Sequence, residues 1–252
     1  MKPARPATFG KLLLAALAIG AGTVVRAQGP ETISTDRPDQ SDGVYTVPVG
    51  VFQLENGINL AEDLLLNDLM VRYGLGKRSE ARLVVDAGTV AGESGLLLVV
   101  FSVKQRLVEA RGALPAIAFV GYAGIGALAT GEFQEDRITT ELKLAFEQDL
   151  SERFGLGYNL GTSDPFRNFN LTCGLGYSAG DRLSAFVEYF ATFSQGPPQH
   201  NVDAGVLFAL TPVLQVDLAG GRALFAREER TFLTAGLAYR FGVAASDKAL
   251  EQ

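Results

Sequence analysis

The stretch ELKLAFEQDLSERFGLGYNL (residues 141–160) consists of two alternating runs joined by a short polar link. Before the link, Leu142 and Leu144 alternate with polar neighbours, and after it Phe154 and Leu156 alternate with glycines. Successive side chains of a β-strand point to opposite faces, so apolar residues at a period of two indicate a strand with one apolar face. The stretch therefore predicts an antiparallel β-hairpin with an apolar and a polar side.

Alternation of this kind recurs along most of the sequence. Two segments are less regular: residues 115–126 are almost wholly apolar, and Phe186 and Phe190 lie on an otherwise polar face. Counting both segments gives about twelve strands, and an even number suits an all-β, antiparallel up-and-down barrel. The clearer runs outside the first stretch cover residues 52–60, 69–75, 81–86, 97–107, 169–177, 202–210, 214–218 and 233–241.

The expected links alternate between short turns and longer polar or glycine-rich stretches. In an outer-membrane barrel, short turns gather on the periplasmic rim and longer loops on the opposite rim. We therefore expect both termini on the periplasmic side. The short turns are residues 75–80, 149–154, 178–183 and 210–214, and the longer links are residues 61–68, 88–95, 126–137, 161–168, 194–201 and 220–230.

The first 27 residues have the pattern of a secretory signal peptide. Lys2, Arg5 and Lys11 precede a short apolar run, and Val25 and Ala27 occupy the small-residue positions of a cleavage site. We expect residues 1–27 to be removed and residues 28–50 to form an N-terminal periplasmic or plug segment. The barrel is expected over residues 51–241, followed by a polar tail over residues 242–252.

Composition excludes several classes of protein. Loss of the signal peptide, which holds four of the 22 basic residues, leaves 18 basic against 28 acidic residues and a net charge of −10. A chain this acidic lacks the basic surface that phosphate binding requires, so we expect no nucleic-acid partner. Cys173 is the single cysteine and cannot form an intramolecular disulfide.

The polar faces of the expected strands decide between a soluble and a membrane barrel. They carry many ionisable groups, and each unpaired charge buried in a dry core would cost several kcal/mol. A water-filled lumen would hydrate and pair these groups while the apolar faces contact lipid, so a membrane barrel is favoured over a periplasmic β-sandwich. The polar-face candidates are Gln53, Glu55, Arg72, Arg82, Asp86, Lys104, Arg106, Glu141, Lys143, Glu147, Glu188 and Asp217.

Two early motifs resemble a known family. They are STDRPDQSDGVYTVPVGVFQLENG (residues 34–57) and LMVRYGLGKRSEARL (residues 69–83). The sequence resembles the outer-membrane proteins of the MetA-pathway of phenol degradation family, often described as transporters. The matching features are Thr35-Asp36-Arg37-Pro38, Pro48 with Gly50, the run from Phe52 to Gly57, and Arg72-Tyr73-Gly74-Leu75. The resemblance implies a barrel with a transport-like role, and its solute is left open.

The charged cluster Asp36, Arg37 and Asp39 precedes the first strand and admits three interpretations. It could tie an N-terminal segment to the barrel wall, form part of a plug that enters the lumen, or act as a catalytic carboxylate pair. Without a neighbouring base or nucleophile the catalytic interpretation is the weakest. The charges on the polar faces admit two interpretations, a fixed ladder of salt bridges or a binding site for a charged solute.

His200 is the single histidine, and Ser194 and Asn201 are near it in sequence. A barrel lipid enzyme would need such a group, but an exposed histidine at the end of a loop is the simpler interpretation. We expect no enzyme activity, no cofactor and no metal site.

The sequence therefore predicts an outer-membrane channel or transporter for small, hydrophobic or aromatic solutes. A non-transporting structural or surface-interaction barrel is the main alternative. The expected partners are outer-membrane lipid, a small-molecule solute and the barrel-assembly machinery. The machinery is implied by LTAGLAYRF (residues 233–241), which resembles a C-terminal assembly signal.

Overall fold

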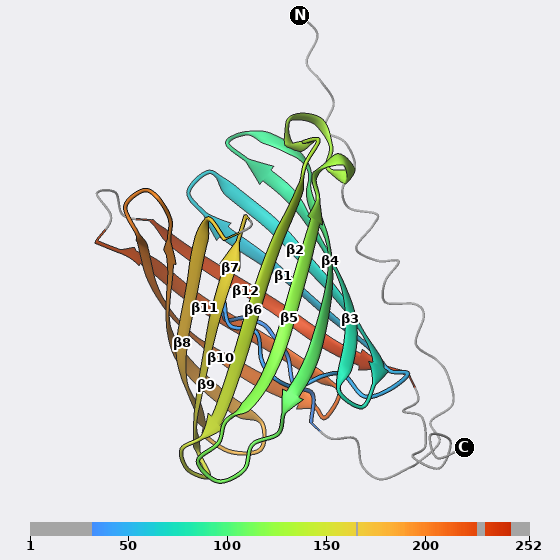
Figure 1. The fold of residues 1–252 in the computed structure, drawn as a ribbon, viewed down its shortest axis with the longest axis vertical. Helices are drawn as coiled ribbons and strands as arrows, with labels where there is room; N and C mark the ends of the chain where they lie inside the picture. Colours follow the sequence, from blue (N-terminus) through green and yellow to red (C-terminus); the bar gives the residue numbers. More distant parts are fainter. Residues whose placement is uncertain (1–31, 165, 226–229, 243–252) are drawn as a thin grey trace, which may run out of the picture. The chain divides into compact units, whose positions relative to one another are not determined.

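The computed structural model describes residues 32–164, 166–225 and 230–242. Within these residues the chain forms a closed antiparallel barrel of twelve strands, in which each strand pairs with its sequence neighbours and β1 pairs with β12 (Figure 1). The predicted fold class is confirmed. The strands are β1 (Phe52–Ala61), β2 (Leu64–Gly76), β3 (Ser79–Val90), β4 (Glu93–Val108), β5 (Ala116–Ile125), β6 (Ile138–Asp149), β7 (Phe154–Ser163), β8 (Asn168–Ser178), β9 (Leu183–Phe193), β10 (Gln199–Thr211), β11 (Leu214–Leu224) and β12 (Thr231–Phe241).

The side chains are distributed as expected for a barrel in lipid. Outward-facing apolar residues are exposed, with Phe101 at 53% and Leu142 at 41%. The inward-facing residues Arg72, Glu80 and Lys104 are at most 1% exposed. A soluble barrel would show the reverse arrangement, so the outer face is the lipid-facing face of a transmembrane β-barrel.

Two of the expected long links are instead two-residue turns, and the prediction of loops over residues 61–68 and 88–95 is wrong. The alternation continues to Ala61 and resumes at Leu64, and it likewise continues to Val90 and resumes at Glu93. Such turns need left-handed backbone, which Asp63 (φ 53°), Ala91 (φ 50°) and Gly92 (φ 89°) provide.

The link between β5 and β6 is a true loop. It holds two 3₁₀ turns, η2 (Gly126–Leu128) and η3 (Gly131–Phe133), which lie at the top of the barrel in Figure 1. No helix within the described residues is long and apolar enough to span a bilayer.

Aromatic rings form an outer cluster where the first and last strands meet. The Phe52 ring lies 4.5 Å from the Tyr73 ring and 5.7 Å from the Phe241 ring, measured between centroids. The Phe154 and Tyr177 rings are 5.0 Å apart at the same end of β7 and β8. These are interfacial positions of the kind occupied by an aromatic girdle. The expected signal peptide, and all of the expected tail beyond Gly242, lie outside the described residues.

The residues before β1 run inside the barrel. Ile33 N donates to Pro212 O at 2.8 Å at the rim, and Val49 bridges to Gly74 of β2. Between these points the chain, here called the lumenal segment (residues 34–48), contacts the inward faces of most strands; it is the blue trace within the barrel in Figure 1. Gly74 allows the close approach, because a Cβ there would lie 2.0 Å from Pro48 O.

Candidate functional site: the lumen and the lumenal segment

Asp36 is the centre of a buried ionic cluster. Its carboxylate accepts hydrogen bonds from Lys104 Nζ at 2.8 and 2.9 Å and from Arg82 Nη2, and Arg72 Nη1 lies 3.5 Å away. Burial by itself raises the pKa of Asp36, but the charges of Arg72, Arg82 and Lys104 outweigh burial and lower that pKa to about 2. Asp36 is therefore ionised and held by three cations of β2, β3 and β4.

Two wall carboxylates complete this cluster. Arg72 donates to Glu55 Oε1 at 2.7 Å and to Glu80 Oε1 at 3.0 Å, and Arg82 Nε donates to Glu80 Oε1 at 2.6 Å. Buried charges are tolerated only when they are paired and hydrogen-bonded. The ladder of salt bridges and the lumenal segment therefore form one network.

A second anchor lies at Asp42. Its carboxylate accepts hydrogen bonds from Arg82 Nη1 at 2.8 Å, Lys143 Nζ at 3.1 Å and Tyr122 Oη at 2.5 Å. Burial opposes ionisation, but Lys143 and Arg82 hold the pKa of Asp42 well below its usual value. The backbone N–H of Asp42 also donates to Asn159 Oδ1 at 2.7 Å.

Arg37 occupies a niche made by two glycines. Gly57 of β1 and Gly236 of β12 are register partners, and a Cβ on either would lie 2.1 or 2.6 Å from the Arg37 side chain. From this niche Nη1 donates to both Asp68 oxygens, at 2.6 and 2.8 Å. Nη2 donates to Thr234 Oγ1 at 2.9 Å and lies 3.3 Å from Asp217 Oδ1.

Wall carboxylates also bind the backbone of the lumenal segment. Because the segment is not part of the sheet, its N–H groups need other acceptors. Four of them donate to carboxylates of four different strands. The pairs are Asp36 N to Glu55 at 3.0 Å, Gln40 N to Glu188 at 2.7 Å, Val44 N to Glu147 at 3.0 Å and Val47 N to Glu80 at 2.7 Å.

The remaining predicted residues lie around this network. Gln53 donates to Glu55 Oε1 at 2.7 Å, and Glu141 accepts from Asn170 at 3.1 Å. Arg106 lies near the β2–β3 turn, where Nη2 donates to Lys77 O at 3.2 Å. Asp86 is the register partner of Asp68 and is half-buried.

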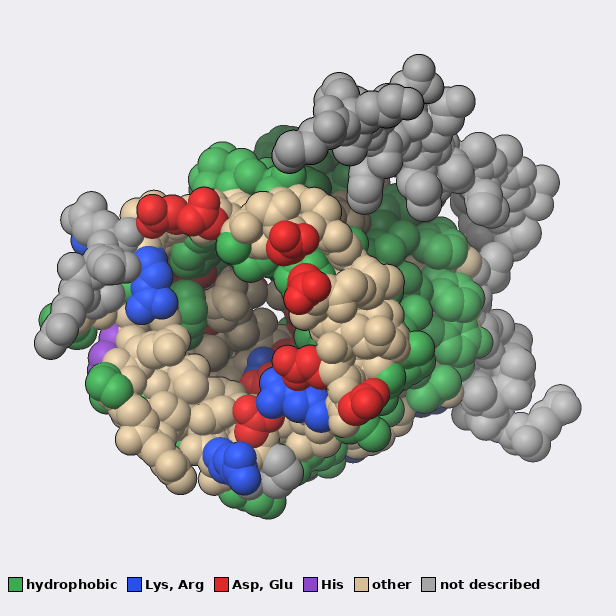
Figure 2. All heavy atoms as spheres, turned by 90° about the horizontal axis from the view of Figure 1, so that it is seen from above, with side chains coloured by type: hydrophobic (Ala, Val, Ile, Leu, Met, Phe, Trp, Pro, Cys, Tyr) green, Lys and Arg blue, Asp and Glu red, His purple; other side chains and the backbone are tan. Residues whose placement is uncertain are grey.

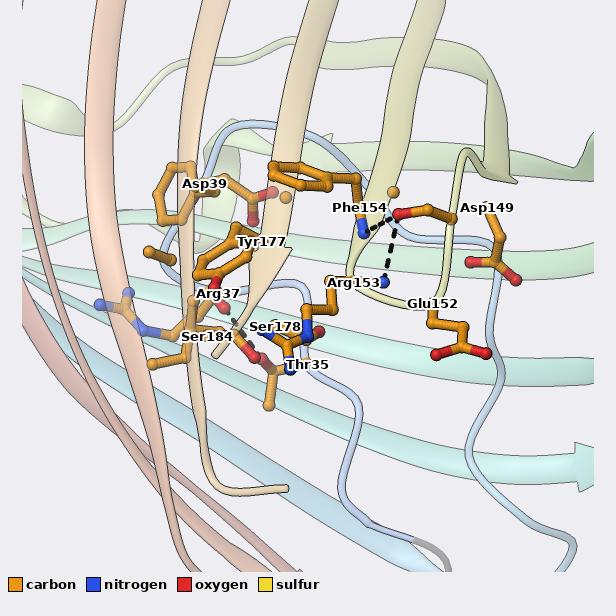
Figure 3. A pocket seen from close by; sticks show the side chains of 16 residues that line it. Thr35, Arg37, Asp39, Asp149, Glu152, Arg153, Phe154, Tyr177, Ser178 and Ser184 are labelled. Atoms are coloured by element: carbon orange, nitrogen blue, oxygen red, sulfur yellow. Dashed lines mark hydrogen bonds between the residues drawn. The ribbon is translucent and has the colours of Figure 1, made fainter. Parts of the chain in front are cut away.

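Asp39 differs from the other acids of the lumenal segment. It is half-buried, and burial together with the carboxylates of Glu188 and Asp36 raises the pKa of Asp39 well above its usual value. It lines a cavity of about 270 Å³ between the lumenal segment and the ends of β7, β8 and β9 (Figure 3). Thr35, Arg153 and Ser184 line the same cavity.

The side of the lumen nearest this cavity carries small residues. The inward positions of β7 and β8 are glycine, serine, threonine and asparagine, as in the register pairs Gly157–Gly174 and Asn159–Thr172. The opposite mouth of the barrel is hollowed, and acidic and basic side chains line its rim and interior (Figure 2). Space beside the lumenal segment thus lies against the least bulky wall.

Several residues of the network are not among the candidates predicted from the sequence. Asp42, Glu80 and Tyr122 bind its central charges, and Asp68 and Thr234 bind Arg37. All but Asp42 lie at inward positions of the alternation, so strand parity could have identified them. Asp42 could not be found in this way because it lies outside the strands.

His200 lies on the outer face rather than in the lumen. Its Nδ1 is 2.6 Å from Tyr189 Oη, and its ring packs edge-on against Phe193 and Phe225. These neighbours are those of an aromatic cluster at the barrel exterior. Ser194 Oγ accepts a hydrogen bond from Gly196 N at 3.3 Å, and Asn201 is the register partner of Ala223.

Comparison with known proteins decides the family. The profile of the family described as "Putative MetA-pathway of phenol degradation" matches residues 35–241, which include the lumenal segment from Thr35 onward and all twelve strands. The chain belongs to this family. No curated protein matches the sequence.

Several solved outer-membrane barrels share the fold at low identity. The KdgM porin is 10% identical, with a TM-score of 0.59 over 75% of this chain and 99% of the porin. The COG4313 outer membrane channel from Pseudomonas putida F1 is 12% identical, with a TM-score of 0.58 over 81% of this chain and 100% of the channel. The NanC porin is 7% identical, with a TM-score of 0.57 over 75% and 98% of the two chains. These similarities place the chain among barrels with the architecture of outer-membrane porins and channels.

Proposed function

We propose that the protein is a passive outer-membrane channel whose lumen is narrowed by its own N-terminal segment. The observation that carries this proposal is the ionic docking of residues 34–48 inside the barrel, where cations of β2, β3 and β4 bind Asp36 and Asn159 of β7 binds the backbone of Asp42. A barrel of about eight strands has a filled interior and one of sixteen or more has an open channel, so twelve strands with a partial plug suit a narrow pore.

The shape of the interior supports a small solute. The cavity beside Asp39 is comparable in volume to the smallest ligand sites, about 300 Å³. It lies between the lumenal segment and the wall, so a solute that follows it would contact Thr35 on one side and Ser184 on the other. A larger solute would require the segment to leave its docking site.

Inward-facing aromatic rings support passage of hydrophobic or aromatic solutes. The Phe186 ring covers Gly205, because a Cβ on that glycine would lie 2.5 Å from it, and the Phe232 ring covers Gly221 in the same way at 2.6 Å. Phe190 is near Phe232, with 6.4 Å between ring centroids. One wall of the lumen therefore offers aromatic surface, whereas β2, β3 and β4 offer charge.

The same proposal covers location and partners. The lipid-facing outer surface supports insertion in a bacterial outer membrane, and the short turns beside the chain ends support periplasmic termini. The aromatic end of β12 at Phe241 supports delivery by the barrel-assembly machinery. The outward position of His200 supports a non-enzymatic role.

A proteoliposome swelling assay tests the proposal. Vesicles with the protein should swell in isosmotic solutions of small solutes that cross lipid slowly, such as phenylalanine or arabinose, and much less in a trisaccharide of larger cross-section. Swelling equal to that of protein-free vesicles for every solute would instead favour a structural barrel closed by its ionic network, the alternative that the density of buried ion pairs supports.

A further inference from the structure

Two acidic side chains face each other in the lumen on neighbouring strands. Glu188 of β9 and Asp203 of β10 are register partners and are 1% and 2% exposed. Side chains directly opposite on antiparallel strands have their Cβ atoms about 5 Å apart, and like charges in that position repel. Glu188 is partly compensated, since its oxygens accept from Gln40 N and Ser41 Oγ.

Asp203 has no such compensation. Within the described residues, neither of its carboxylate oxygens has a hydrogen-bond partner. A buried carboxylate without a donor or counter-charge is strongly disfavoured, because desolvation costs several kcal/mol. The charge at this position is therefore relieved either by a bound proton or by an occupant that supplies positive charge.

Two cations of the lumen, Lys143 and Arg37, do not provide this charge. Lys143 Nζ lies 3.1 Å from Asp42 and 3.5 Å from Glu141. Arg37 is directed to Asp68, Asp217 and Thr234. Lys143 and Arg37 are thus committed to other carboxylates, and Arg153, which lines the cavity beside Asp39, is the remaining cation there among the described residues.

Asp39 connects this acidic pair to the cavity beside the lumenal segment. It lines the cavity, and it is close enough to Glu188 and Asp203 for both carboxylates to oppose its ionisation. We propose that Asp39, Glu188 and Asp203 form a binding site for a singly charged cation, which makes the passage cation-selective. This inference rests on the proposed channel function.

The site is assigned to a hydrated, singly charged cation because the described residues lack a chelating arrangement. No group of three or more acidic, cysteine or histidine side chains in the described ranges has the geometry of a metal-chelating site. The three carboxylates therefore act by their summed charge on a hydrated cation such as K⁺, or on the ammonium group of an organic cation.

The test is the reversal potential across a planar bilayer with unequal KCl on the two sides. Asp203→Asn is the informative variant, because the Asp203 side chain makes no hydrogen bond to the lumenal segment. Asp181→Asn, in the exposed β8–β9 turn, is the matched control with the same change of charge. The wild type and the control should favour K⁺ over Cl⁻. The variant should lose about fivefold in that preference, the effect of one unit charge about 4 Å from the ion in water. Equal reversal potentials for wild type and Asp203→Asn would overturn the inference.

A second measurement separates this inference from the channel proposal. If the wild type carries no current, the channel proposal fails, and the urea midpoint of the refolded protein in detergent decides the cation site. Raising KCl should stabilise the wild type and Asp181→Asn more than Asp203→Asn, because a bound cation stabilises the folded state. If the urea midpoints of all three proteins depended on KCl in the same way, a cation site would be contradicted. Repeating the measurement with an alkylammonium salt in place of KCl shows whether organic cations also bind.

Discussion

Arg37 Nη1 donates to both carboxylate oxygens of Asp68, at 2.6 and 2.8 Å, although the two residues lie 31 positions apart in the sequence. The contact joins the lumenal segment to β2 across the interior of the barrel. Charge-assisted hydrogen bonds of this kind are about twice as strong as neutral ones. Arg37 is therefore a principal attachment of the segment.

Replacement of Arg37 should release this attachment. Arg37→Gln leaves Asp217, whose side chain is fully buried, without its cation, and breaking one partner of a buried pair costs about 3–5 kcal/mol. We expect faster hydrogen exchange at the amides of Val44 and Val47, which are bound to wall carboxylates only while the segment is docked. Hydrogen–deuterium exchange followed by mass spectrometry measures the exchange rates of these two amides.

Arg78→Gln is the control for that substitution. Its partner Glu109 is as exposed as Arg78 itself, at 49%, and surface pairs contribute about 0–1 kcal/mol. Exchange at Val44 and Val47 should be unchanged in this variant. Equal acceleration in both variants would mean that Arg37 has no specific role.

Gly57→Ala tests the glycine niche without altering any charge. The new methyl group would lie 2.1 Å from the Arg37 guanidinium, so the arginine must move away from Asp68. We expect the same exchange pattern as for Arg37→Gln, with the barrel itself intact by circular dichroism. Gly155→Ala is the matched control, because its methyl group would have no neighbour closer than 4.0 Å. If residues 34–48 remained docked in Gly57→Ala, the claim that Arg37 needs the glycine niche would be refuted.

Acid should undock the lumenal segment. The pKa of Asp36 is about 2 when docked, against an ordinary value of 3.8, and the pKa of Asp42 is also lowered. A lowered pKa contributes stability that is complete above pH 3.8 and is lost as the pH falls towards 2. Asp39 acts in the opposite sense, since its raised pKa means that ionisation at higher pH weakens docking.

The measurement is amide exchange at Val44 as a function of pH, corrected for the intrinsic rate. Protection should fall between about pH 4 and pH 2, and Asp36→Asn should lack most of this transition. Protection that is constant across that window would exclude Asp36 and Asp42 as the acid-sensitive anchors.

The aromatic wall should affect some solutes more than others. Phe186→Leu removes a ring that covers Gly205 in the lumen, so swelling in phenylalanine should slow relative to swelling in arabinose. Phe208→Leu changes a ring of the lipid-facing surface, 40% exposed, and should leave both rates unchanged. A parallel change in the two rates for Phe186→Leu would indicate an altered pore width rather than aromatic recognition.

Strand parity accounts for most of what the sequence predicts. The period of two places Arg72, Arg82 and Lys104 on one face of the sheet. Because the apolar face must contact lipid, these three side chains are then expected to point into the lumen. The barrel follows from the same pattern, whereas the family was indicated by the motifs at residues 34–57 and 69–83. The two-residue turns at Asp63 and Gly92 were missed because polar and glycine-rich residues also occur in longer loops.

The contacts of the lumenal segment could not be predicted from the sequence. They join residues far apart in the chain, such as Asp42 to Lys143 and Gln40 to Glu188. No periodicity constrains a segment without regular structure, so parity does not determine which wall carboxylate binds which amide. Asp36 and Arg37 were recognised as charged, but only the fold brings β2, β3 and β4 to Asp36. Closure of the barrel likewise brings β2, β11 and β12 together at Arg37.

Single-channel conductance after deletion of residues 34–42 tests the central claim most directly. The deletion removes Asp36, Arg37, Asp39 and Asp42 while leaving every strand of the barrel in place. If the lumenal segment limits passage, the deleted protein should show a several-fold higher conductance than the full-length protein in the same bilayer and salt. An unchanged conductance in a correctly folded deletion variant would contradict the claim that this segment narrows the pore.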